Sequence, residues 1–214
     1  MSKRKVWGLT AKNNEQSEAI HALMSADIDL VVLHGTAGSG KTLLSLAAGL
    51  EQVLENHMYK NILFTRAPIA VGEDIGFLPG TEEEKLAPWC GALIDNLEML
   101  IGDDKLTEVY LKTKIKIRAM QFMRGRSFTN RYVIVDEVQN ITTPQLKVLL
   151  TRAGEGTKIV CLGDASQCDN KKLNSENNAL STLIKYAKDV DFIRVVELPS
   201  GVRSQLCEWA ARVL

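Results

Sequence analysis

The chain has 214 residues, 45% of them hydrophobic and 24% charged, and its formal net charge at pH 7 is zero. These values exclude a disordered or strongly basic chain and are typical of one globular domain, which we expect to span residues 1–214. A neutral chain has no overall field that would draw it onto nucleic acid or a membrane surface. No apolar run reaches the ~20 residues of a membrane span, and the four cysteines lack the spacing of a zinc site. We therefore expect a cytoplasmic protein with reduced thiols and no membrane partner.

Apolar runs alternate with helical patterns along the chain, which is typical of an α/β fold. The expected strands are, in chain order, 30–34, 61–65, 114–119, 132–136, 158–163 and 192–198. The expected helices are a short one after residue 13, then 43–56, 90–101, 144–152, 177–188 and a terminal helix from about residue 202. Thr143 suits the N-cap of the helix that follows it, with Pro144 in its first position. The pattern predicts a mostly parallel sheet sandwiched by helices, with ligand sites at the carboxyl ends of the strands.

Residues 35–42 read GTAGSGKT and follow the apolar strand expected at 30–34, which is the context of a Walker A loop. Glycines let such a loop turn its N–H groups inward around a chain of phosphates, and the following helix directs its positive dipole end to the same place. Lys41 is expected to reach the β- and γ-phosphates, and the Thr42 hydroxyl to ligate Mg²⁺. The residues expected to hold the nucleotide are Gly35, Thr36, Ala37, Gly38, Ser39, Gly40, Lys41 and Thr42.

Three further patterns extend this nucleotide site. The strand at 132–136 ends in Asp136, expected to hold Mg²⁺ through water, and is followed by Glu137, the expected general base. Gln167, after the next strand, can contact the γ-phosphate or the attacking water, although a solvated turn would explain it as well. Upstream, the amide of Gln16 can pair with adenine and would favour ATP over GTP, unless it only serves the start of a helix.

The order of several motifs resembles that of PhoH-like ATPases over about residues 10–210. These motifs are GTAGSGKT, RAPIAVGEDIGFLPGTEEEK at 66–85, MRGRSF at 123–128, VDEVQN at 135–140, LLTRAG at 149–154 and GDASQ at 163–167. The resemblance implies an α/β, RecA-like P-loop NTPase related to the first core domain of superfamily 1 helicases. It also implies ATP and Mg²⁺ as cofactors, hydrolysis of ATP and action on RNA. The chain is then expected to be a short stand-alone form, without the PIN ribonuclease domain of some members.

Hydrolysis of this kind is accelerated by a cation placed against the charge that develops on the γ-phosphate. In two-domain helicases the second domain supplies this cation, and a chain of 214 residues has no room for such a domain. Arg203, which matches an arginine motif of the family, is the expected donor to a neighbouring subunit, with Arg152 as the alternative. We therefore expect a head-to-tail homo-oligomeric ring, and the family resemblance implies six subunits.

A basic stretch lies between residues 109 and 135, with seven basic side chains and no acidic one. Its lysines alternate with apolar residues, so on a strand they would share one face. The candidate contacts to nucleic acid are Arg66, Lys114, Lys116, Arg118, Arg124 and Arg126. Phe122, Phe128 and Tyr132 are interleaved with them, as on a stacking platform for a single strand. The alternative is a solvated edge strand beside aromatic residues of the core.

Two functions fit these patterns. The first is an ATPase coupled to single-stranded nucleic acid as a helicase-like remodeller; the residues leave RNA and DNA open, and the resemblance favours RNA. The second is a slow ATP-gated switch or assembly module without helicase activity. A small-molecule kinase fits less well, because phosphoryl transfer to a metabolite needs neither the Asp-Glu pair nor the GDASQ element.

Overall fold

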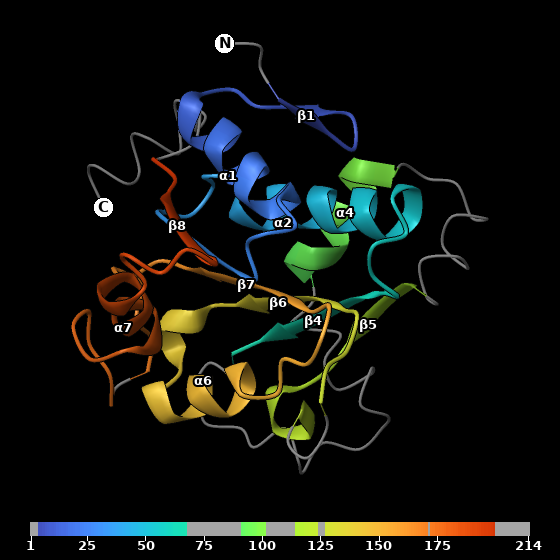
Figure 1. The fold of residues 1–214 in the computed structure, drawn as a ribbon. Helices are drawn as coiled ribbons and strands as arrows, with labels where there is room; N and C mark the ends of the chain where they lie inside the picture. Colours follow the sequence, from blue (N-terminus) through green and yellow to red (C-terminus); the bar gives the residue numbers. More distant parts are fainter. Residues whose placement is uncertain (1–3, 68–90, 102–113, 124–126, 171, 200–214) are drawn as a thin grey trace.

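The computed structural model describes residues 4–67, 91–101, 114–123, 127–170 and 172–199 (Figure 1). The expected terminal helix and three of the expected site residues, Arg203, Arg124 and Arg126, lie outside the described residues. The same holds for nearly all of the irregular stretch expected at 67–89.

Within the described ranges, six strands form one parallel sheet in the order β5-β4-β6-β7-β3-β8. The strands are β3 (Leu30–His34), β4 (Ile62–Arg66), β5 (Ile115–Ile117), β6 (Tyr132–Asp136), β7 (Lys158–Gly163) and β8 (Ile193–Glu197). All six were expected, although β5 is shorter than the predicted range. The central strands are buried on both faces, which is why they read as continuous apolar runs.

Helices cover both faces of the sheet (Figure 1). The helices on one face are α1 (Asn14–Met24), α2 (Lys41–Leu50) with its π-helical extension η1 (Glu51–Glu55), and α4 (Gly91–Ile101). Those on the other face are α6 (Thr143–Leu150) and α7 (Ala179–Tyr186). The strand β3 shows the alternation that divides the core, because Val31 and Leu33 join the cluster under α1 and α2, whereas Leu30 and Val32 join the one under α6 and α7. The sandwiched sheet expected from the sequence is confirmed.

Three short elements complete the described fold, namely the antiparallel hairpin of β1 (Lys5–Val6) and β2 (Leu9–Thr10) and the 3₁₀ turns η4 (Met120–Met123) and η5 (Val138–Asn140). The hairpin was not expected. Trp7 lies in the turn of the hairpin and has a positive φ of 45°. Its indole N–H donates to the carbonyl of Leu100, which connects the hairpin to the end of α4. Among the described helices, none combines the length and the apolar character needed to cross a bilayer.

The N-cap of α6 is Thr142, so the expected cap at Thr143 is wrong by one residue. The hydroxyl of Thr142 accepts from the backbone N–H of Gln145, whose side chain accepts in turn from the backbone N–H of Thr142. This reciprocal pair satisfies two donors at once, whereas a cap at Thr143 would satisfy fewer. Pro144 still lies in the first turn, where its missing N–H is not needed.

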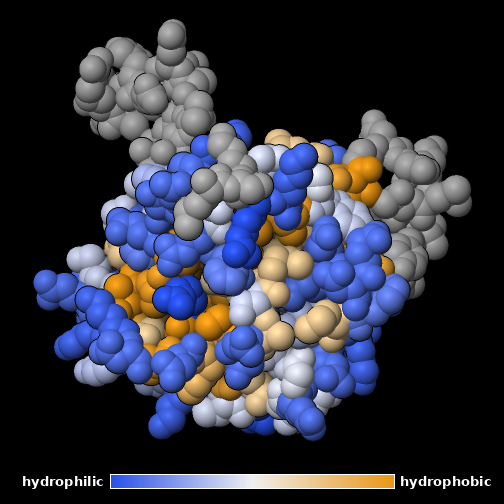
Figure 2. Space-filling view, turned by 45° about the horizontal axis from the view of Figure 1, so that its top comes forward, coloured by the Kyte–Doolittle hydropathy of each residue, from blue (hydrophilic) through white to orange (hydrophobic). Residues whose placement is uncertain are grey.

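The surface is mostly hydrophilic, in keeping with the composition. Figure 2 shows blue residues over most of the visible face, with hydrophobic residues gathered in a smaller area at the left of the view. Six large hydrophobic side chains are more than a third exposed among the described residues, namely Met58, Ile94, Met99, Val148, Tyr186 and Phe192. Ile94 and Met99 both lie on α4, and the other four come from different parts of the chain.

Candidate nucleotide site at the carboxyl ends of the strands

The loop between β3 and α2 has the backbone that a Walker A sequence predicts. Gly35, Gly38 and Gly40 all have positive φ, at 142°, 78° and 91°. A side chain at Gly35 would also collide with the carbonyl oxygen of Leu198, which lies 2.0 Å from the position of a Cβ. Gly40 is the N-cap of α2 in the left-handed conformation, so the helix begins at Lys41. The loop therefore wraps in front of a helix N-terminus, the arrangement that binds anions.

The ammonium group of Lys41 points into this loop. Its Nζ donates to the carbonyl oxygens of Gly35, at 2.5 Å, and Thr36, at 2.9 Å, and lies 3.4 Å from the hydroxyl of Ser39. These contacts place one positive charge in the hollow of the loop. They satisfy the expectation that Lys41 and the loop backbone face the same space.

Asp136 and Glu137 follow each other at the end of β6. Asp136 is 8% exposed, and its pKa is raised to about 6, chiefly by burial and then by the neighbouring negative charge of Glu137. The positive charges of Arg66 and Lys41 act in the opposite direction. The Walker A loop follows β3 and the acidic pair ends β6, so both lie at the carboxyl ends of strands that flank β7 in one parallel sheet.

Both oxygens of the Glu137 carboxylate accept hydrogen bonds. Oε1 accepts from Nη2 of Arg66 at 3.1 Å, and Oε2 accepts from Nε2 of Gln139 at 2.5 Å. The same arginine also lies near Asp136, with 3.9 Å between its Nε and Oδ2 of the carboxylate. The sheet register explains the contact, since Arg66 on β4 is paired with Asp136 on β6. The backbone of Glu137 is itself left-handed, at φ 58° and ψ 41°, which turns its side chain away from the strand direction.

Gln139 is a site residue that the sequence reasoning did not assign. Its side chain is fully buried and joins the ends of β6 and β7. Besides Glu137, its Nε2 donates to the backbone carbonyl of Gln167 at 3.1 Å, and its Oε1 accepts from the backbone N–H of Asp164 at 3.2 Å. Gly163 leaves room for this amide, because a Cβ there would lie 2.6 Å from Oε1. The available signal was a polar residue two positions after the Asp-Glu pair, but spacing alone does not say where its amide points.

With this geometry in place, the comparisons with known proteins identify the family. The family model for PhoH-like proteins matches residues 8–214. The chain belongs to the PhoH-like family. Its sheet and flanking helices form the expected α/β, RecA-like fold.

Two relatives and one solved structure illustrate how far the similarity extends. Protein PhoH2 of Bacillus subtilis (strain 168) is 43% identical over 213 residues, which cover 98% of this chain and 48% of that protein. A PhoH-like protein of Synechocystis sp. is 37% identical over 181 residues, covering 85% of this chain and 54% of that protein. This PhoH-like chain thus spans about half the length of the curated relatives it matches. The crystal structure of Pif1 helicase from Candida albicans aligns with a TM-score of 0.46 and 17% identity, over 95% of this chain and 43% of that one.

Gln16 and Gln167 both lie at the nucleotide end of this PhoH-like fold. Nε2 of Gln16 lies 3.4 Å from the carbonyl oxygen of Ser39 in the Walker A loop, and its Oε1 accepts from the backbone N–H of Lys12. Gln167 has an exposed side chain and donates its backbone N–H to the carbonyl of Asp164, within a turn. Both residues therefore take part in local structure, and their contacts to adenine and to phosphate stay predictions.

The basic candidates are divided between two places. Arg66 lies at the acidic pair. Lys116 is exposed on β5, which is an edge strand in the described sheet, and Lys114 directly precedes that strand. On the same strand Ile115 and Ile117 pack against the core, as the expected alternation requires. Arg118 donates its backbone N–H to the carbonyl of Phe64, just beyond β5.

The predicted aromatic stacking platform is wrong for two of its three residues. Phe128 and Tyr132 are 4% and 0% exposed, so neither ring is open to a base. Tyr132 begins β6 and packs edge-on against Tyr59, with 5.6 Å between ring centroids. Tyr132 is buried because β6 is covered on both faces, whereas Phe128 lies before β6 and belongs to the core cluster that contains residues of α6. The side chain of Phe122 lies outside what the structure describes.

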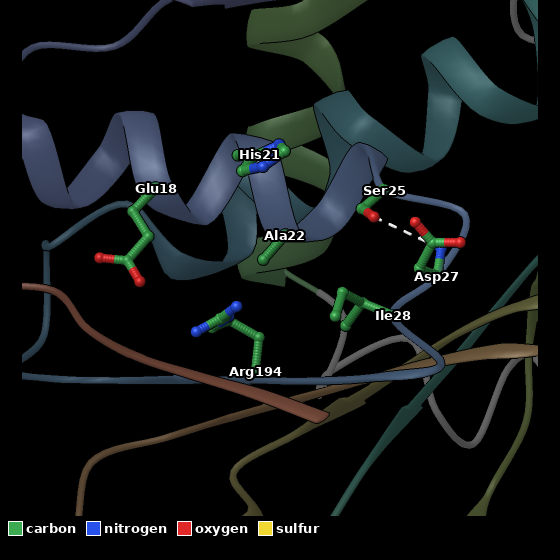
Figure 3. A pocket seen from close by; sticks show the side chains of 7 residues that line it. All are labelled: Glu18, His21, Ala22, Ser25, Asp27, Ile28 and Arg194. Atoms are coloured by element: carbon green, nitrogen blue, oxygen red, sulfur yellow. Dashed lines mark hydrogen bonds between the residues drawn. The ribbon is translucent and has the colours of Figure 1, made fainter. Parts of the chain in front are cut away.

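A second hollow lies away from the nucleotide site, near the amino end of the sheet (Figure 3). Its volume is about 330 Å³, and its lining comes from α1, the segment after it and β8, with the residues Glu18, His21, Ala22, Ser25, Asp27, Ile28 and Arg194. None of the residues expected to bind nucleotide lines it. The pocket therefore lies at the opposite end of the sheet from the Walker A loop.

Proposed function

We propose that this chain binds ATP together with Mg²⁺ and hydrolyses it, and that hydrolysis is coupled to single-stranded nucleic acid. The supporting observation is that the carboxyl ends of the strands carry both a Walker A loop, after β3, and a carboxylate pair, after β6 two strands away. The outer carboxylate, Glu137, is held by two donors, as a base that must be oriented would be. A single RecA-like domain over residues 1–214, in the cytoplasm, is part of the proposal.

The triphosphate would lie in the Walker A loop. Gly35 to Gly40 supply a curved backbone, α2 directs its N-terminus to the same point, and Lys41 brings the charge that the β- and γ-phosphates need. On binding, the ammonium of Lys41 would exchange its contacts with loop carbonyls for phosphate oxygens. Gln16, which touches the loop at Ser39, would read the adenine.

The donors at this edge fit Mg²⁺. Thr42 offers a hydroxyl at the start of α2, and Asp136 offers a buried carboxylate at the end of β6. Burial raises the pKa of the Asp136 carboxyl group to about 6, which means that its charged form has lost hydration. A nearby cation would stabilise that charged form. Mg²⁺ prefers a few carboxylate or hydroxyl oxygens and completes its shell with water and phosphate. When bound, the ion would neutralise charge on the phosphate oxygens.

Glu137 would act as the general base. Its carboxylate takes a proton from the water whose oxygen attacks the γ-phosphorus, while the bond from that phosphorus to the bridging oxygen breaks and ADP leaves. Gln139 would keep this carboxylate oriented, and Gln167 would contact the γ-phosphate or the water. Arg203 of a neighbouring subunit, or else Arg152, would supply the cation against the developing charge.

The nucleic-acid partner would meet the basic residues of the edge strand and its surroundings. Lys114, Lys116 and Arg118 follow one another there, and Arg66 lies at the end of the adjacent β4. Contacts to backbone phosphates do not depend on the base sequence of the strand. The family resemblance favours RNA over DNA. A homo-oligomeric ring, of six subunits by that resemblance, would bring the arginine in trans. The alternative remains a slow ATP-gated switch that organises a partner.

The test is steady-state ATP hydrolysis with Mg²⁺, with and without single-stranded RNA and DNA, beside the Lys41→Ala variant. We expect turnover in the wild type, more of it with one of the strands, and none in Lys41→Ala. Turnover that ignores both strands would favour the switch. No turnover above the Lys41→Ala control under any condition would contradict the ATPase.

A further inference from the structure

Glu137 is held from two sides by partners of different kinds. Gln139 is neutral and fully buried, and its amide also bonds the backbone at Asp164 and Gln167. Arg66 is charged, and a quarter of its side chain is exposed. A buried amide that joins the ends of two strands exchanges its partners slowly, whereas a long, partly exposed charged side chain can move. The arginine is thus the partner of Glu137 that an incoming ligand could remove.

The contact to Arg66 opposes the role of Glu137 as a base. Oε1 accepts a hydrogen bond from Nη2 of Arg66 at 3.1 Å, while Oε2 accepts one from Nε2 of Gln139. An oxygen that accepts a charge-assisted hydrogen bond is a weaker acceptor for the proton of water. As long as both contacts persist, each oxygen of Glu137 already accepts one hydrogen bond and is a weaker base toward the attacking water.

Arg66 also has the chemistry that recognises a phosphate group. Its planar guanidinium presents five donors in a fork that fits phosphate oxygens as well as it fits a carboxylate. It lies at the carboxyl end of β4, next to the edge strand β5 with its exposed Lys116. Lys116 is exposed and a quarter of the Arg66 side chain is exposed, whereas Asp136 is buried, so an anion from solvent reaches these two cations more easily than it reaches Asp136.

We propose that Arg66 is a positioning residue that holds Glu137 away from the attacking water until a phosphate group takes its guanidinium. This inference rests on the proposed ATPase function and adds the step that would couple it to a strand. The phosphate could belong to the backbone of a single strand or be free in solution. In either case the guanidinium moves from Oε1 of Glu137 to the phosphate, and Oε1 becomes free to accept a proton.

The experiment compares the wild type with Arg66→Gln, Arg66→Lys and a control, Lys147→Gln, which removes one exposed positive charge from α6. ATP turnover is measured alone, with a single-stranded oligonucleotide and with inorganic phosphate. We expect Arg66→Gln to raise the turnover without strand about 10- to 150-fold, the factor that corresponds to losing one charge-assisted hydrogen bond of about 1.5–3 kcal/mol. Addition of the strand should then give no further rise. The control should behave as the wild type in every arm.

The outcomes distinguish a failure of the positioning role of Arg66 from a failure of the proposed ATPase function. Damage to the fold lowers turnover, so a rise in Arg66→Gln cannot come from misfolding. An active wild type with unchanged or slower Arg66→Gln would overturn the positioning role and leave the ATPase intact. If neither protein hydrolyses ATP, the proposed function fails and this inference with it. Stimulation of the wild type by phosphate alone would identify the free anion as the ligand, and stimulation by the oligonucleotide alone would identify the strand.

Arg66→Lys provides the second variant in case Arg66→Gln does not fold. A lysine keeps the charge beside Asp136 and Glu137 but replaces the fork by one compact ammonium group. We expect turnover without strand between that of the wild type and that of Arg66→Gln, with a smaller response to the strand. A response equal to that of the wild type would show that charge alone suffices and would overturn the role of the guanidinium fork.

Discussion

The two ends of the sheet both bury a charged group, with different consequences. At the carboxyl end, Asp136 lies among Glu137, Arg66 and Lys41, and burial raises its pKa to about 6. At the amino end, burial lowers the pKa of Lys158 to about 8, and its ammonium donates to the backbone carbonyls of Ser25 and Ile28. Both pKa values are displaced chiefly by burial, so a displaced pKa by itself does not distinguish a site from a structural contact.

The neighbours of each charge make the distinction. Lys158 at the start of β7 ties down the segment before β3, and the carbonyls it contacts have fixed positions in the fold. The charges at the carboxyl end face one another across β4, β6 and the Walker A loop, and a ligand can change which of them are paired. The comparison therefore predicts that changes at the carboxyl end alter turnover more than stability, and that changes at the amino end do the reverse.

The largest effect is expected for Lys41→Ala. This change removes the positive charge from the hollow of the loop, so ATP should bind more weakly and turnover should fall by at least about 10³-fold. Nucleotide affinity by calorimetry and steady-state hydrolysis would measure the two effects. The melting temperature without nucleotide should change little, and a large fall in it would mean that Lys41 mainly supports the fold.

Glu137→Gln should reduce turnover next most strongly, by about 10²- to 10³-fold, because an amide cannot take the proton of the attacking water. ATP and Mg²⁺ should still bind, since Lys41, Thr42 and Asp136 are unchanged. Single-turnover hydrolysis beside an ATP-binding measurement checks both statements. Normal hydrolysis by this variant would remove Glu137 from the role of base.

Gln139→Leu should affect both turnover and stability. Leucine has a similar size but cannot bond Glu137, the Asp164 N–H or the Gln167 carbonyl, so the base and the loop after β7 lose their common support. We expect turnover to fall about tenfold and unfolding to become easier by about 1–3 kcal/mol, the cost of leaving buried polar groups without partners. Chemical denaturation and hydrolysis on one preparation would test this. A change in stability without a change in turnover would make Gln139 a structural residue only.

Lys158→Met should have the smallest effect on turnover. It should lower stability at pH 7, because the carbonyls of Ser25 and Ile28 lose their donor, and it should remove one source of the pH dependence of stability. The pKa of Lys158 is about 8 in the folded protein and about 10.4 in an unfolded chain, so between these values the unfolded state holds more protons. The wild type should therefore gain stability as the pH rises through this window, by about 2 kcal/mol between pH 8 and 9.5.

Denaturation of both proteins at several pH values would show the difference. The Lys158→Met variant should lack this gain, while its ATP turnover at pH 7 stays that of the wild type. An equal gain in both proteins would mean that another group titrates in this window. A loss of turnover in the variant would contradict the separation of the two ends of the sheet.

Local patterns were enough to predict the Walker A loop and the strands. The glycines of residues 35–42 fix a backbone with positive φ wherever the loop lies, and β3, β6 and β7 read as apolar runs because they are buried on both faces. The cap of α6 was local as well, but it was predicted one residue late because the pairing of Thr142 with Gln145 was overlooked. The same local evidence predicts that Asp136 holds Mg²⁺ and that Glu137 is the general base, and both roles stay predictions.

The fold class, the family and the position of the glycine-rich loop were predictable from the sequence, because each depends on short segments whose conformation is set locally. Which side chains contact each other depends on the packing of the strands. Arg66 reaches Glu137 because β4 and β6 are neighbours, although about 70 residues separate them in the chain. Tyr132 is buried rather than open for stacking because helices cover its strand, and Gln139 joins two strand ends because β6 lies next to β7. Contacts between strands depend on sheet order and register, which no single segment contains.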